Sequence, residues 1–403
     1  MRCRCCGSAL EQVFSLGSMP LVNAFLKKEE LDKEKKYPLN LCFCQKCFLV
    51  QLSHTIPSRE LYSNYLYFSS TSSSFLQYCE DTANKLIKRL GLIKDSLVLE
   101  VASNDGAQLK YFQSNSIKVL GVDPAKNIVR EANKNGITTI CDFFSLKLAR
   151  ELVSKKKIQA DLIFGANVLA HVPKIIDFVS GIKLILKPHG TAVFEFPYLE
   201  GLLENKFDTI YHEHIFYYSL LALRNLFSKA NLAIYDVEMT QMQGGSLQIF
   251  VSHTNMFPIS KNVDKMLAQE LKAGFDKVAT YRLIKTRVDK LKASLLKFLL
   301  KLKKADKRIA AYSAPAKGNV LLNYFGIGNN YLDFIVDKSP AKQGLYTPGT
   351  HLLVYPPNKI YAEKPDYLLI LCWNIADEVI KEHQKFQKAC GKFIIPVPKL
   401  KIL

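Results

Sequence analysis

Tyr211, His212, Glu213 and His214 are consecutive in the sequence, and side chains of these types can transfer protons. A histidine accepts a proton near neutral pH, and a neighbouring carboxylate can orient the ring or raise its basicity. If the segment is extended, His212 and His214 share one face; if it is helical, all four side chains crowd one turn. A His-x-His metal site and a buried polar cluster that holds a loop remain alternatives. Because the cluster follows an expected strand, we favour proton transfer.

A second set of reactive side chains lies near the N-terminus, where six of the ten cysteines fall within the first 47 residues. Two C-x-x-C knuckles there can each present two thiolates to one tetrahedral zinc ion, which would have no open position and would therefore be structural. The expected ligands are Cys3, Cys6, Cys44 and Cys47. Cys5 and Cys42 make this register ambiguous, and free thiols are the alternative.

Residues 97–123 form a candidate cofactor site. An apolar run, a glycine-containing turn, a helical segment and a second apolar run follow one another there and end at Asp123. This order predicts the nucleotide-binding half of a doubly wound α/β sheet. The turn lacks G-x-G-x-x-G, which disfavours a dinucleotide, whereas its pattern is typical of an S-adenosylmethionine (SAM) site in a class I methyltransferase. A βαβ unit with a chance acid is the alternative. The expected cofactor contacts are Glu100, Ala102, Ser103, Asn104, Asp105, Gly106, Asp123 and Pro124.

Later strands of the same sheet are expected at residues 136–141, 161–165 and 190–197. Ligands bind at the carboxyl ends of strands in open α/β sheets, so residues that follow these strands are further candidates. Asp142 and Phe143 would contact the adenine, and Asn167 would face the ligand. Lysine-rich amphipathic helices are expected from about 259 to 305. Strands at 309–312, 332–337, 366–371 and 392–396 predict a second, smaller α/β unit.

Composition limits the class of protein. A chain of 403 residues with 48% hydrophobic and 23% charged residues is expected to fold into two or three domains. The sequence shows no apolar run of membrane-spanning length and no signal-peptide core, so we expect a cytoplasmic protein without membrane contact. The formal net charge of +19 first suggests nucleic acid. We expect no nucleic-acid partner, because the lysines are spread over many segments and fit solvated helical faces.

Several short motifs then carry a resemblance over nearly the whole chain. Besides the knuckles, the SAM turn and the 211–214 cluster, they are Tyr67-Phe68-Ser69-Ser70, the segment 167–173, Gly244-Gly245-Ser246-Leu247, the segment 314–319 and Asp337-Lys338-Ser339-Pro340. Each motif is weak alone, but their order is specific. The chain resembles the nucleotide-sugar C-methyltransferases of deoxysugar biosynthesis.

The resemblance implies a zinc domain (1–70), a SAM-dependent methyltransferase domain (71–256), a helical linker (257–306) and a C-terminal Rossmann-like domain (307–403) that helps to bind a nucleotide-linked keto-deoxysugar. It implies a SAM cofactor, one structural Zn²⁺, and a monomer or homodimer. The substrate contacts that it implies are Tyr67, Ser70, Asn167, Gly244, Gly245, Lys317 and Asn319. Gln243 and Gln248 depart from the family, which often has histidine and arginine there.

The chemistry that the resemblance implies begins with an enolate, because carbon next to a ketone becomes a nucleophile only after it loses a proton. His214 would be the base, supported by Glu213. Tyr211, His212 or His171 would stabilise the enolate oxygen or return a proton. An RNA methyltransferase and a non-enzymatic zinc-ribbon binding module are the competing interpretations.

Overall fold

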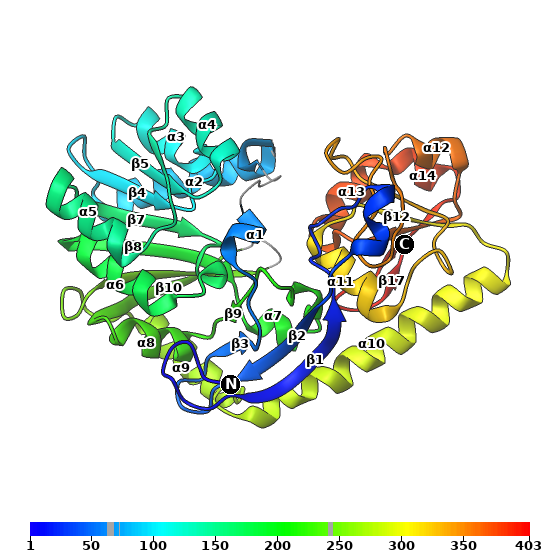
Figure 1. Ribbon diagram of the computed structural model, residues 1–403, viewed down its shortest axis with the longest axis horizontal. Helices are drawn as coiled ribbons and strands as arrows, with labels where there is room; N and C mark the ends of the chain where they lie inside the picture. Colours follow the sequence, from blue (N-terminus) through cyan, green and yellow to red (C-terminus); the bar gives the residue numbers. More distant parts are fainter. Residues whose placement is uncertain (63–67, 72, 241–244) are drawn as a thin grey trace.

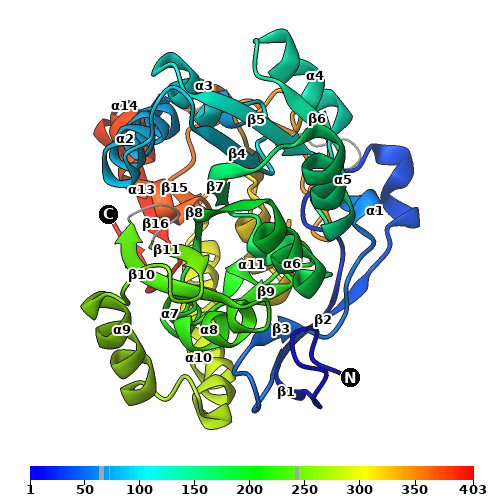
Figure 2. The same cartoon turned by 90° about the vertical axis from the view of Figure 1, so that its left-hand side faces the viewer.

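The computed structural model describes residues 1–62, 68–71, 73–240 and 245–403, and within them the strands form three sheets (Figures 1 and 2). The central sheet contains, in spatial order, β10 (Leu232–Thr240), β11 (Ser246–His253), β8 (Leu186–Pro197), β7 (Ala160–Ala166), β4 (Leu97–Val101), β5 (Lys118–Asp123) and β6 (Thr139–Cys141). Strands β6, β5, β4, β7 and β8 are parallel, whereas β11 runs antiparallel to both β8 and β10. Because β4 lies inside the sheet with later strands on both sides, the ends of β4 and β7 form the switch point at which such sheets bind ligands.

The N-terminal sheet contains β1 (Glu11–Met19), β2 (Tyr37–Phe43), β3 (Val50–Leu52) and β9 (Phe216–Tyr217). Strand β9 directly follows the 211–214 cluster in sequence, yet it pairs with β3 of the N-terminal sheet. The backbone N–H of Leu52 also donates to the carbonyl of Ile215 at 2.8 Å. The zinc domain is therefore hydrogen-bonded to the segment that carries the candidate base.

The C-terminal sheet contains β14 (Val354–Tyr355), β13 (Phe334–Val336), β12 (Ile309–Tyr312), β15 (Tyr367–Ile370), β16 (Lys392–Ile395) and β17 (Lys401–Ile402). All neighbouring pairs are parallel except β16 and β17. This strand arrangement is the Rossmann-like fold predicted for the last hundred residues.

Helices cover the sheets and join the units. They are α1 (Ser58–Tyr62), α2 (Ser73–Leu90), α3 (Ala107–Ser114), α4 (Lys126–Lys134), α5 (Leu146–Lys156), α6 (Ile175–Ile185), α7 (Glu200–Leu203), α8 (Leu220–Ser228), α9 (Lys261–Lys272), α10 (Val278–Lys304), α11 (Ala316–Phe325), α12 (Lys359–Glu363), α13 (Ala376–Glu382) and α14 (Gln384–Lys388). The long α10 runs beneath the other elements in Figure 1 and reaches the C-terminal unit. Its buried residues recur every three or four positions, so one face packs on the core while lysines remain in water.

One buried core runs through all three units. The ring of Phe43 in β2 packs against Tyr281 of α10, with ring centroids 4.7 Å apart, so the N-terminal sheet is anchored to the linking helix. Within the described residues, no helix combines the length and apolar character needed to cross a lipid bilayer.

The structure differs from the sequence patterns at a few elements. The third strand of the central sheet begins at Thr139 rather than Gly136, because Gly136 (φ 80°) and Ile137 close the end of α4 through hydrogen bonds to its carbonyls. The patterns do not predict β10, which is only partly buried, or the strands β9, β14 and β17, whose two residues are too few to show a pattern.

Candidate active site and metal centre

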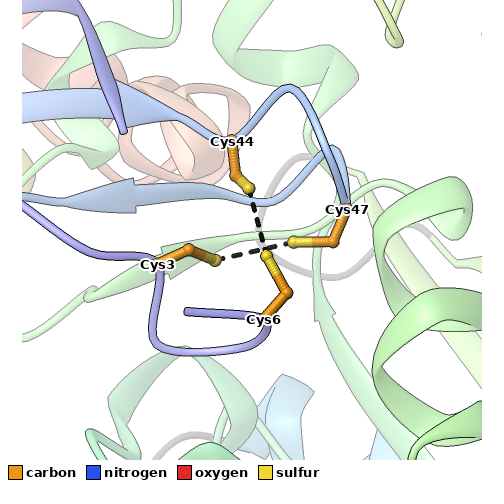
Figure 3. Close-up of side chains that lie close together, drawn as sticks. All are labelled: Cys3, Cys6, Cys44 and Cys47. Atoms are coloured by element: carbon orange, nitrogen blue, oxygen red, sulfur yellow. Dashed lines mark hydrogen bonds between the residues drawn. The ribbon is translucent and has the colours of Figure 1, made fainter. Parts of the chain in front are cut away.

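Four cysteine sulfurs meet at one end of the N-terminal sheet, where a single ion could hold them (Figure 3). The ligand atoms of Cys3, Cys6, Cys44 and Cys47 all lie within 4.8 Å of one another. The side-chain amide of Gln51 donates to Cys3 Sγ at 3.1 Å, which supports the thiolate form. Four thiolates complete a tetrahedral zinc shell, so the residues fit a structural ion rather than a catalytic one.

Of the two extra cysteines in this region, neither joins the group. Cys42 is buried within β2, opposite Gln12 and Gln51 of the neighbouring strands. Cys5 lies inside the first knuckle, and its backbone N–H donates to Cys3 Sγ at 3.4 Å. The spacing ambiguity is therefore resolved in favour of the expected four ligands.

The turn after β4 has a backbone that few sequences adopt. Ala102 (φ 58°), Asn104 (φ 49°) and Gly106 (φ 82°) all have left-handed conformations within five residues. Left-handed conformations of non-glycine residues carry strain and concentrate at functional sites. The next strand approaches this turn so closely that a Cβ on Gly121 would lie 2.5 Å from Ser103 Oγ. This geometry fits a turn that presents its backbone to a ligand.

Asp123, the acid at the end of β5, holds the turn in place. Its carboxylate accepts the backbone N–H groups of Asn104 at 3.1 Å and Ala125 at 2.9 Å. Each carboxylate oxygen has a second lone pair, so Asp123 can still accept the ribose hydroxyls of a cofactor. Pro124 follows at the strand end and is half-buried.

Two further acids lie beside Asp123. Glu100 is fully enclosed, and burial, followed by the charges of Asp123 and Asp105, raises the pKa of its carboxyl well above the ordinary value. Glu100 Oε2, Ser103 Oγ and Asp105 Oδ1 make no hydrogen bond within the described residues. These unpaired polar atoms, gathered at the carboxyl end of β4, fit the binding of a polar cofactor.

Ser70, which is expected to contact substrate, is hydrogen-bonded to the turn after β4. Its backbone N–H and hydroxyl donate to Asp105 Oδ2 at 3.1 and 2.6 Å. The backbone N–H of Ser69 donates to Asn104 Oδ1 at 3.0 Å. The Ser69–Ser70 segment therefore covers the turn that should hold SAM. Tyr67, the other substrate residue expected in this segment, lies outside the described residues.

The remaining expected cofactor residues also lie at strand ends. Asp142 and Phe143 follow β6 and are exposed, so the Phe143 ring can offer an apolar face to an adenine. Asn167 follows β7 in a left-handed conformation (φ 55°), and its backbone N–H donates to the carbonyl of Glu195 in β8 at 2.7 Å. Its side chain is thereby placed at the switch point of the sheet.

The 211–214 cluster is neither extended nor helical but forms a turn between the short helix Phe207–Thr209 and β9. The hydroxyl of Tyr211 lies 2.7 Å from His214 Nε2, and His214 Nδ1 lies 3.0 Å from the carbonyl of Thr209. A carbonyl only accepts, so Nδ1 carries the proton and Nε2 accepts the hydrogen bond from Tyr211. His214 is thus held in the tautomer that a general base requires.

His171 completes the group of side chains around His214. The two rings meet edge to face with centroids 4.9 Å apart. Desolvation lowers the pKa of His171 to about 4. Burial, and then the charges of His171 and Lys317, lowers the pKa of His214 well below its ordinary value. Both imidazoles are therefore neutral at neutral pH and able to accept a proton.

His212 and Glu213 point instead toward the zinc domain. His212 Nε2 donates to the carbonyl of Tyr37 at 3.2 Å, and Glu213 Oε1 accepts from the amide of Asn23 at 2.6 Å. Burial raises the pKa of Glu213 to about 6. The structure therefore joins Tyr211, His214 and His171 and places the other two members of the cluster at the domain interface.

Lys317 and Asn319 are both in α11 but have different surroundings. The side-chain amide of Asn319 donates to the carbonyl of Val22, so it fastens α11 to the zinc domain. The Lys317 ammonium lies 5.0 Å from the ring centroid of Trp373, whose Nε1 donates to Asp208 Oδ2 at 2.6 Å. Sequence reasoning missed Asp208, Trp373, Thr209 and Asn23, because no local pattern marks residues whose roles depend on packing between domains.

Trp373 and His214 line one cavity together with Gly245, which lies just before β11. Gly245 (φ 115°) adopts a backbone conformation that favours glycine. Gly244 and Gln243 lie outside the described residues. Gln248, which departs from the family pattern, is buried and donates to Glu195 Oε2 at 3.1 Å. It therefore makes an internal hydrogen bond of the central sheet.

Comparisons with known proteins match three successive parts of the chain. Family models match as a zinc binding domain over residues 3–62, a methyltransferase domain over 75–237 and a C-methyltransferase C-terminal domain over 241–398. The C-methyltransferase NovU of Streptomyces niveus is 34% identical over 405 aligned positions, which cover 100% of this chain and 96% of NovU.

Two solved structures each match about half of the chain. A SAM-dependent methyltransferase of Clostridium acetobutylicum is 12% identical with a TM-score of 0.37, and the match covers 45% of this chain and 92% of that one. The PH0226 protein of Pyrococcus horikoshii is 16% identical with a TM-score of 0.38, covering 50% of this chain and 100% of that one. The full-length relationship is decisive: the chain belongs to the SAM-dependent C-methyltransferases, with SAM as cofactor and a four-cysteine zinc domain at its N-terminus.

Proposed function

We propose that the protein methylates a carbon next to the ketone of a nucleotide-linked keto-deoxysugar, through an enolate formed at His214. The observation that carries this proposal is the Tyr211–His214 pair, in which Thr209 fixes the tautomer and leaves Nε2 as the acceptor. A carbon acceptor needs a base before it can take a methyl group, whereas a hydroxyl or amine acceptor already has a nucleophilic lone pair. The sugar is supported by the ordered motifs of the sequence.

In the proposed reaction, the carbon next to the ketone gives its proton to His214 Nε2. The electron pair of the broken C–H bond forms a carbon–carbon double bond, and the carbonyl oxygen becomes an oxyanion. Tyr211, released from Nε2, donates its hydroxyl proton in a hydrogen bond to that oxygen. When bound, SAM supplies an electrophilic methyl group, and the turn after β4 with Asp123 would hold it.

His171 lies against His214 and would receive or return a proton on the same side of the site. Glu213 and His212 would act indirectly, since their hydrogen bonds to Asn23 and Tyr37 fix the turn that carries the base. Glu213 would therefore not act directly on His214, because its carboxylate is hydrogen-bonded to Asn23.

The test is a mass-spectrometric methylation assay with SAM and 4-keto-6-deoxy sugars linked to dTDP, GDP or CDP, beside an RNA sample. We expect one methyl group on one sugar and a loss of at least ~100-fold in rate for His214→Gln, in the range usual for a general base. His189→Gln is the matched control, because His189 is exposed in β8. Methyl transfer to RNA instead of any sugar would refute the proposal.

A further inference from the structure

A buried lysine of the C-terminal unit packs on Trp373, which lines the same cavity as the candidate base. Lys317 stands in the first turn of α11, and α11 lies on the side of the C-terminal unit nearest to α7 in Figure 1. Within the described residues, its ammonium is fully shielded and makes no hydrogen bond. Burying a cation without a partner is unfavourable, so an unpaired buried lysine calls for an explanation other than stability.

The neighbours of Lys317 hold it close to an acid without pairing it. The ammonium lies over the Trp373 ring, and Trp373 donates its indole proton to Asp208 Oδ2. Asp208 is fully buried, and its Oδ1 also lacks a hydrogen-bond partner in the part of the chain that the structure describes. Burial lowers the pKa of the Lys317 ammonium, the nearby charge of Asp208 raises it, and the charge of Lys317 in turn lowers the pKa of Asp208. A cation and an acceptor thus stand near each other with bonding capacity unused.

The same lysine is near His214. Its positive charge contributes to the low pKa of His214, after burial and His171. Trp373, which packs on Lys317, lines the cavity that His214 also lines. Residues of the C-terminal unit therefore reach the centre where the proton would be removed.

The chemistry explains why a cation would be placed there. A neutral histidine with a lowered pKa is a weak base, and removal of a proton next to a ketone leaves a full negative charge on oxygen. A donor that bonds the oxyanion more strongly than the ketone lowers the barrier of that step. A buried ammonium is well suited, because its charge is little screened.

We propose that Lys317 is a catalytic residue, which donates a hydrogen bond from its ammonium to the enolate oxygen formed when His214 takes the proton. The inference rests on the proposed keto-sugar function. The C–H proton goes to His214 Nε2 and the electron pair to the ketone oxygen, while Lys317 keeps its proton and shares it with that oxygen. Asp208 and Trp373 are positioning residues: Asp208 keeps Lys317 protonated, and Trp373 orients the carboxylate.

The experiment isolates the proton-transfer half of the reaction. Wild-type protein is incubated without SAM in D₂O with dTDP-4-keto-6-deoxyglucose and the GDP and CDP analogues, and deuterium uptake next to the ketone is followed by NMR. We expect Lys317→Met to slow uptake by ~100-fold or more, the usual loss for one oxyanion donor. SAM affinity, measured by calorimetry, should not change. Lys385→Met is the matched control, because Lys385 is an exposed lysine of the same unit.

The melting temperature of Lys317→Met distinguishes a catalytic lysine from one that holds the domains together. If Lys317 is an unpaired buried cation, the variant should keep or raise the melting temperature, whereas loss of a residue that joins the domains should lower it clearly. Trp373 is the sole tryptophan of the chain, so its fluorescence reports whether the site remains intact in each variant. Should Lys317→Met fail to fold, Asp208→Asn provides the second test, and we expect it to slow uptake while leaving SAM affinity unchanged.

Two results would overturn the inference. Deuterium uptake at the wild-type rate in a folded Lys317→Met protein would remove Lys317 from the reaction while leaving the keto-sugar proposal intact. The absence of both uptake and methyl transfer in wild-type protein with every sugar would instead refute the proposed function, and the role of Lys317 would fall with it.

Discussion

The pKa of Glu213 provides a quantitative test of how the 211–214 turn is buried. Its carboxyl is enclosed at the interface with the zinc domain, and burial raises its pKa from 4.5 to about 6 despite the hydrogen bond from Asn23. A raised pKa in the folded state means that Glu213 favours folding most at low pH. That contribution is lost as the pH rises from the unfolded value through the folded value.

The size of the effect follows from the shift. A shift from 4.5 to about 6 corresponds to a cost of about 2 kcal/mol once the carboxylate is ionised in both states. At pH 8 the Glu213→Gln variant, which has no charge to bury, should therefore be more stable than the wild type by about 2 kcal/mol. At pH 5 most of this gain should be gone, leaving less than about 1 kcal/mol.

Urea unfolding at both pH values measures this difference. Effects of pH on the zinc ligands or on other acids cancel, because the two proteins are compared at each pH. Glu80→Gln on α2 is the control, since Glu80 is exposed and its replacement should change neither value. A Glu213→Gln variant that is less stable than the wild type at pH 8 would show that the carboxylate is stabilised in its charged form, contrary to this reasoning.

Three further predictions concern the metal, the cofactor turn and its closest packing. Removing zinc with a chelator should abolish methyl transfer and increase amide hydrogen exchange at β9. The reason is that β3, which follows the second cysteine knuckle, pairs with β9. Unchanged exchange at β9 would contradict this coupling. Asp123→Asn should weaken SAM binding ~10- to 100-fold in calorimetry, since hydrogen bonds to a charged acceptor are worth about 1.5–3 kcal/mol. The control is Asp95→Asn, because Asp95 is exposed. Equal SAM affinities of the two variants would refute the assignment of Asp123 to the cofactor site. Gly121→Ala should lower the free energy of unfolding in urea by about 1–3 kcal/mol, because the new methyl group would collide with Ser103 and Thr139. The same collision should lower SAM affinity. A wild-type affinity would show that the turn does not depend on this packing.

Much of the fold follows from local sequence. The strands at 97–101 and 309–312 are apolar except for Glu100, and such apolar runs predict buried parallel strands wherever they lie in the chain. Strand β9 has only two residues and no such pattern, and it exists because β3 of the zinc domain supplies its hydrogen bonds. Local patterns cannot anticipate a pairing between segments more than 150 residues apart.

The site divides in the same way. The zinc ligands and the cofactor turn could be predicted because knuckle spacing and the turn of a βαβ unit are local features. The partners of the 211–214 cluster could not, since the turn directs Glu213 to Asn23 and His214 to Thr209. The packing of Lys317 on Trp373, which lines the same cavity as His214, depends on how the C-terminal unit packs against the central one.

The position of the transferred methyl group tests the central claim most directly. Wild-type protein, SAM and the keto sugar that accepts a methyl group would be analysed by two-dimensional NMR of the product. We expect a new carbon–carbon bond at the position next to the ketone, and the loss of that product with His214→Gln. A methyl group on a sugar oxygen or nitrogen, or an unchanged product from the His214 variant, would contradict it.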